Sequence, residues 1–118
     1  MEEKRKSVLD SVIETKNKRR EIEELVKKLS KLNIMVLLNY SLDNFSIDDS
    51  IDDLKRILTL AEEKEWFKEV LKKCKENNIT ICLINSSKSY VNKNGEVIYI
   101  NFVNDNSEEK IKRFLLGE

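Results

Sequence analysis

NIMVLLNY, residues 33–40, is the stretch that decides the fold of this chain, together with ITICLI, residues 79–84. Both runs are apolar at successive positions and too short for an independent helix, which is typical of strands buried on both faces. Because such strands must be covered above and below, we expect helices on both faces of their sheet. The segment between the runs is helical in pattern. The two strands are therefore expected to be parallel neighbours joined by a right-handed crossover.

The crossover segment carries two helical patterns. Ser46 precedes Asp49 by three residues, which predicts a helix that starts with Ser46 as its N-cap. One apolar stripe follows, formed by Ile47, Ile51, Leu54, Leu58 and Ala61. The stripe fails at Glu65, and Thr59-Leu60-Ala61-Glu62 repeats the capping pattern. We therefore expect two helices, or one kinked helix, across residues 47–76.

The C-terminal third predicts a hairpin and a last helix. Residues 88–92 and 96–103 are joined through Lys93-Asn94-Gly95, and Asn-Gly is a strong hairpin signal in which Gly95 supplies a positive φ. Asp105 is expected to cap the last helix. The expected core-facing residues are Ile98, Ile100 and Phe102 in the second arm of the hairpin and Ile111, Phe114 and Leu115 in the last helix.

Residues 1–32 predict a long amphipathic helix that precedes an α/β core over residues 33–118. Its apolar residues recur at alternating steps of four and three, as in a coiled-coil seam: Val8, Val12, Ile22, Val26 and Leu29. Thr15 and Arg19 make the middle of the seam polar. Two interpretations stay open. Either the C-terminal half of the helix packs on its own domain, or the five apolar residues form the interface of a homo-oligomer.

These elements together predict an α/β or α+β fold in one small domain over residues 1–118. A mixed sheet of about four strands combines the βαβ crossover with the C-terminal β-hairpin. Helices flank the sheet, and the long N-terminal helix completes one layer or projects from it.

The composition excludes several kinds of chemistry. The 118 residues include no His, two Gly and two Cys, and 22 basic side chains balance 22 acidic ones. Without His there is no His-based triad, and the two Gly cannot form a phosphate-binding loop. Cys74 and Cys82 lie among apolar neighbours and are expected to be reduced core thiols. We expect no metal, no cofactor and no catalytic residues, so the chain is not expected to be an enzyme.

The chain contains no apolar stretch long enough to span a bilayer, and its charged start leads into no signal peptide. We therefore expect a cytoplasmic protein without a membrane partner.

Polar residues follow both predicted strands, at the edge where parallel strands bind ligands. A small polar or anionic ligand could be held there by Asn39, Ser41, Asp43, Asn85, Ser86 and Lys88. The simpler interpretation is that Asn, Ser and Asp side chains bond their own backbone in loops.

The same two loops resemble, in Ser41-Leu42-Asp43-Asn44 and Asn85-Ser86-Ser87, the first two motifs of the haloacid-dehalogenase-like phosphatases. That family has two aspartates at the end of its first strand, where this chain has Leu37 and Asn39. Without those carboxylates neither a phosphoryl-aspartate nor a bound magnesium ion follows from the resemblance.

The order of elements also resembles the winged-helix plan, which would place Gly95 at a wing tip and residues 60–76 in the DNA major groove. That segment carries Glu62, Glu63, Glu65 and Glu69, which a phosphate backbone repels. The basic cluster lies instead on the N-terminal helix and consists of Lys16, Lys18, Arg19 and Arg20.

Trp66 stands beside Phe67 on adjacent faces of one predicted helix, so both rings cannot easily be buried. Phe67 is expected in the core, and Trp66 is a candidate contact for a partner.

The function we expect is a soluble protein-interaction or regulatory module, adaptor-like or inhibitor-like, that binds another protein or a second copy of itself. The alternatives are a winged-helix-like nucleic-acid-binding regulator and a domain that binds a small polar or anionic ligand.

Overall fold

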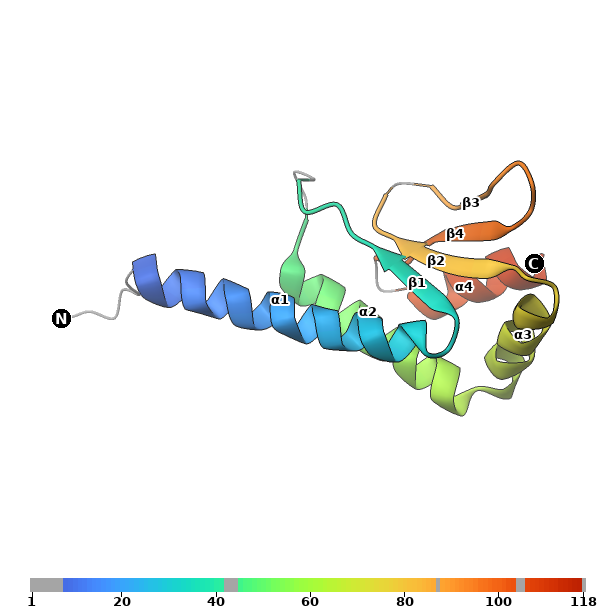
Figure 1. Ribbon diagram of the computed structural model, residues 1–118, viewed down its shortest axis with the longest axis horizontal. Helices are drawn as coiled ribbons and strands as arrows, with labels where there is room; N and C mark the ends of the chain where they lie inside the picture. The colour runs from blue at the N-terminus through green and yellow to red at the C-terminus, as the bar shows by residue number, and fades with distance from the viewer. Residues whose placement is uncertain (1–7, 42–44, 87, 104–105, 118) are drawn as a thin grey trace.

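The computed structural model describes residues 8–41, 45–86, 88–103 and 106–117. The elements follow the order α1 (Val8–Ser30), β1 (Ile34–Leu37), α2 (Ile47–Glu63), α3 (Glu65–Glu76), β2 (Thr80–Ile84), β3 (Tyr90–Val91), β4 (Val97–Asn101) and α4 (Ser107–Leu116) (Figure 1). The predicted fold class is confirmed, because the structure is a small α+β fold with a four-stranded mixed sheet and a long N-terminal helix.

The sheet has the strand order β1-β2-β4-β3. β1 pairs with β2 in parallel, with Ile34 opposite Ile81, and β2 pairs with β4 in parallel. β3 pairs with β4 in antiparallel fashion and closes the hairpin. The prediction that residues 34–38 and 79–84 form adjacent, parallel strands is therefore confirmed. β1 and β3 are the two edges of the sheet.

One face of the sheet packs on the helices. Its residues alternate along the strands and belong to the core that side chains from all four helices complete: Ile34, Val36, Ile81, Leu83, Ile98 and Ile100. Phe102, which follows β4, is fully buried in the same core. The hairpin residues expected to face inward therefore do so.

The opposite face of the sheet carries Met35, Leu37, Cys82, Ile84 and Tyr99, as the strand register requires. Met35 is 48% exposed and Leu37 is 52% exposed, so the expectation that helices cover both faces is wrong at β1. Tyr90 stacks on Tyr99 on this side, with 4.5 Å between ring centroids. The helices α1 to α4 pack on the other face of the sheet. Apolar side chains on a strand can stay exposed where no helix packs over them.

The crossover contains two helices, as one of the two expected arrangements required. Ser46 is the N-cap of α2, and its hydroxyl accepts a hydrogen bond from the Asp49 N–H at 3.2 Å. The second predicted helix start at Thr59 is wrong, because α2 continues to Glu63. The helix is interrupted at Lys64, whose backbone is extended, and α3 begins at Glu65. Leu60 and Ala61 are buried in the core, and that packing keeps this turn helical.

Two asparagines end the helices that precede strands. Asn33, after α1, has a φ of 66°, and Asn78, after α3, has a φ of 58°; Asn tolerates this left-handed conformation better than most residues. The Asn33 side-chain amide also donates to the Ile79 carbonyl at 3.2 Å, which ties the two helix–strand turns together. Gly95 has the predicted positive φ, 71°. The predicted cap Asp105 lies outside the described residues, and Asn106 directly precedes α4.

The C-terminal half of α1 packs on its own domain, through Ile22, Leu25 and Leu29, which are buried against α2 and the sheet. This agrees with the first interpretation of the helix. Ile22 and Leu29 are thereby unavailable to a second chain, and Val26 is half-buried. The N-terminal half of α1 projects beyond the rest of the molecule (Figure 1). Among the described helices, none has the length and apolar character needed to cross a membrane.

Candidate functional site

The structure brings together three of the six residues predicted to bind a ligand: Asn39, Ser41 and Asn85. The Asn39 N–H donates to the Asn85 side-chain oxygen at 2.9 Å, and the Asn85 amide nitrogen donates back to the Asn39 carbonyl at 3.2 Å. The Asn39 side-chain oxygen accepts from the Ser41 N–H at 2.9 Å. The predicted juxtaposition of the two loops is real. The Asn85 side-chain amide, however, is already engaged in tying one loop to the other, and the Asn39 side-chain oxygen is engaged within its own loop.

Ser86 and Lys88 interact with each other instead of with these three residues. The Ser86 hydroxyl donates to the Lys88 carbonyl at 3.4 Å, within its own loop. Asp43 lies outside the described residues. The geometry is that of loop closure, and the ligand-binding role stays a prediction.

The four basic residues of the nucleic-acid alternative point around α1 in different directions. The Lys18 ammonium forms an ion pair with Asp48 at 3.0 Å, and this hydrogen-bonded carboxylate raises the pKa of Lys18. The Arg19 guanidinium lies 4.8 Å from the centroid of the Tyr40 ring. Two of the four cations, Lys18 and Arg19, thus contact their own domain. Lys16, Arg19 and Arg20 are all exposed. The segment 60–76 proposed to enter a major groove is divided at Lys64 between two helices.

Trp66 is half-buried and lies at the junction of α3 and α4. Its ring stacks on Phe67 with 5.3 Å between centroids, and the Lys112 ammonium lies 5.8 Å from its centroid. Phe67 is fully buried, as predicted. These contacts give Trp66 an intramolecular packing role, and its contact with a partner stays a prediction.

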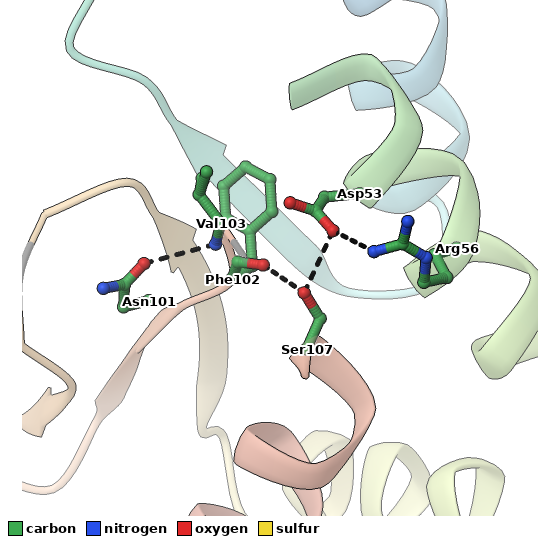
Figure 2. Close-up of polar contacts among 6 residues, drawn as sticks. All are labelled: Asp53, Arg56, Asn101, Phe102, Val103 and Ser107. Atoms are coloured by element: carbon green, nitrogen blue, oxygen red, sulfur yellow. Dashed lines mark hydrogen bonds and ion pairs between the residues drawn. The ribbon is translucent and has the colours of Figure 1, made fainter. Parts of the chain in front are cut away.

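A buried polar cluster joins α2, the end of β4 and α4, and the sequence-based predictions did not include it (Figure 2). Asp53 is 3% exposed and forms an ion pair with Arg56. The Ser107 hydroxyl, 1% exposed, lies 3.1 Å from an Asp53 carboxylate oxygen and also contacts the Phe102 carbonyl. Its one proton can serve only one of these acceptors at a time. The cluster fastens α4 to α2, because the Ser107 hydroxyl at the start of α4 lies between the Asp53 carboxylate on α2 and the Phe102 carbonyl after β4.

Neither the cysteines nor the acidic residues form a site for a metal within the described ranges. No group of three or more potential metal ligands converges there. Cys74 and Cys82 are unbonded and buried, and burial raises the pKa of both thiols, which keeps them neutral and unreactive.

Two further features of the surface are apolar. The first, here called the arm, is the exposed N-terminal part of α1 that carries Val8, Leu9, Val12 and Ile13. The second is the open face and edge of the sheet around Met35 and Leu37. A groove of about 410 Å³ runs between α1 and β1 beside this edge; it is lined by Ile22, Glu23, Val26, Lys27, Val36, Leu37, Leu38 and Tyr40.

Comparison of the chain with protein-family models, with curated proteins and with solved structures found no match. The fold and its surfaces are therefore the basis for a functional proposal.

Proposed function

We propose that this chain is a self-associating protein-interaction module of the adaptor, inhibitor or regulator kind. One observation carries the proposal. Among the described residues, ten large apolar side chains are exposed, and six of them fall in two places. Val8, Leu9, Val12 and Ile13 form the arm, and Met35 and Leu37 lie on the edge strand β1. Apolar groups clustered in this way are typical of association surfaces.

The magnitude of the apolar burial indicates that one cluster alone is insufficient. Covering a half-exposed apolar side chain contributes about 1 kcal/mol. Four such side chains give about 4 kcal/mol, at the low end of the roughly 4–15 kcal/mol that association costs in lost freedom of motion. Stable association therefore requires several of these side chains together with hydrogen bonds or ion pairs.

Light scattering of the full-length protein over a range of concentrations tests the proposal. We expect a mass above that of one chain. A variant with Leu9, Ile13, Met35 and Leu37 each changed to Lys should have the mass of one chain, because it removes apolar surface from both places. The matched control changes the exposed polar residues Ser11, Asn17, Ser30 and Thr59 to Lys, which adds the same charge and should leave the mass unchanged. A one-chain mass for the unmodified protein at every concentration would contradict the proposal.

A further inference from the structure

β1 is an edge strand that lacks the usual protection against pairing. All four of its residues are apolar, and it contains no Lys and no Pro. Natural edge strands are normally shortened, charged or interrupted so that their free hydrogen-bonding groups do not pair with another chain. The opposite edge, β3, follows that rule, because it is two residues long and is flanked in sequence by the exposed Lys88 and Lys93. Of the two edges, β1 is therefore the one suited to adding a strand.

The groove beside β1 carries complementary charges on its α1 rim. Glu23 and Lys27 are exposed, line the groove and stand one helical turn apart, so they present opposite charges along the same helix face. Neither has an ion-pair partner within the described part of the chain. A second α1 helix that ran antiparallel to the first would place each of these residues opposite its complement.

We propose that a second copy of this chain pairs with the free edge of β1 about a two-fold axis, so that one sheet continues through both copies. The inference rests on the proposed self-association and specifies its surface. The two β1 strands run antiparallel, as a two-fold axis perpendicular to the sheet requires. An axis in this direction keeps the open faces of both copies on the same side of the joined sheet. If it passes between the two Val36 residues, Val36 lies opposite the partner's Val36, and Met35 lies opposite the partner's Leu37. The half-exposed apolar side chains thereby cover one another.

The same axis accounts for the rim charges. The groove lining shows that residues 22–27 of α1 lie beside residues 36–38 of the chain. A two-fold axis through Val36 therefore also passes close to the middle of the segment from Glu23 to Lys27. It sets Glu23 against the partner's Lys27, and Lys27 against the partner's Glu23, in two equivalent ion pairs. Backbone hydrogen bonds, apolar contacts and charge pairs thus agree on a single arrangement.

Charge reversal on the rim is the sharpest test. Glu23→Lys leaves two cations on the rim of each copy, and Lys27→Glu leaves two carboxylates. We expect each variant alone to raise the dissociation constant of the dimer by about tenfold or more, through like-charge repulsion. An equimolar mixture of the two variants should form mixed dimers with an affinity close to that of the unmodified protein, because opposite charges then meet again. Sedimentation or light scattering measures both results.

Matched controls keep the outcome interpretable. Glu24→Lys and Lys28→Glu make the same changes one position along α1, at exposed residues that do not line the groove, and should leave the dissociation constant unchanged. Leu37→Lys should abolish the dimer while circular dichroism shows an intact fold, because this side chain is exposed within its own chain.

Three results would overturn the proposal. A one-chain mass for the unmodified protein would remove the proposed function as well. A dimer that tolerates Glu23→Lys, Lys27→Glu and Leu37→Lys would place self-association elsewhere, for example on the arm, and would overturn this interface alone. Equal weakening by the control variants would show that the effect comes from net charge and not from opposed pairs.

Discussion

At the scale of single residues, Asp53 is a carboxylate in the second turn of α2 that is only 3% exposed. Acidic side chains near a helix start are normally exposed to water, and no sequence-based prediction placed this one in the core. The signal was its place four residues before Ile57, on the face of α2 that enters the core. Its partner Ser107 is 54 positions away in the sequence, and a local residue pattern cannot predict a contact between residues so far apart. The proximity of Asn39 and Asn85 could be predicted only because the strands that precede them were predicted to be parallel neighbours.

The buried thiol of Cys82 leads to a prediction about alkaline pH. Burial raises the pKa of Cys82 above its ordinary value near 9. In the unfolded chain the thiol ionises at the ordinary value, so its contribution to stability is fully present below that pH and is lost as pH rises through and above it. Urea denaturation between roughly pH 8 and pH 11 should show a steeper loss of the free energy of unfolding for the unmodified protein than for Cys82→Ala. The two proteins differ only in this thiol, so parallel curves would contradict this account.

At the scale of elements, the type of each helix and strand followed from periodicity, and the boundaries followed from tertiary packing. The Ser46 cap was correctly predicted, because the hydroxyl and the N–H group that it accepts from are three residues apart in any such helix start. The Thr59 cap was wrong, although its pattern is as good, because the turn that follows is buried and stays helical. A local capping hydrogen bond determines where a helix ends only if packing in the core does not keep the neighbouring turn helical.

The two capping patterns therefore make a matched pair for measurement. Ser46→Ala removes the acceptor of the Asp49 N–H and should lower the free energy of unfolding by about 1 kcal/mol. Thr59→Ala lies inside α2 at an exposed position and should change it by less than about 0.5 kcal/mol. Urea denaturation monitored by circular dichroism measures both. Equal losses for the two variants would mean that a helix start exists at Thr59 after all.

At the scale of the whole molecule, the sequence predicted the layers but not how many faces of the sheet they cover. β2 is buried at four of its five positions, whereas β1 has the same apolar character and leaves Met35 and Leu37 exposed. The difference comes from position in the sheet, because β2 has a strand on each side and β1 lies at an edge. Strand order depends on the assembled fold, so the residue pattern within β1 does not indicate that β1 lies at an edge of the sheet.

The same argument applies to α1, whose two halves have similar composition and different surroundings. Residues 22–29 are held by the core, whereas the apolar side chains of the arm are exposed. Between the two, Lys18 and Arg19 contact Asp48 and Tyr40. A helical segment of about ten residues without tertiary support is only marginally stable in water. Backbone amides of residues 12–16 should therefore exchange with solvent far faster than those of residues 25–29, as hydrogen exchange read by NMR would show. Because the interface proposed at β1 leaves the arm uncovered, this contrast should persist at concentrations where the protein is dimeric. Protection of the arm that appears only on dimerisation would instead mark the arm as the surface that the second chain covers.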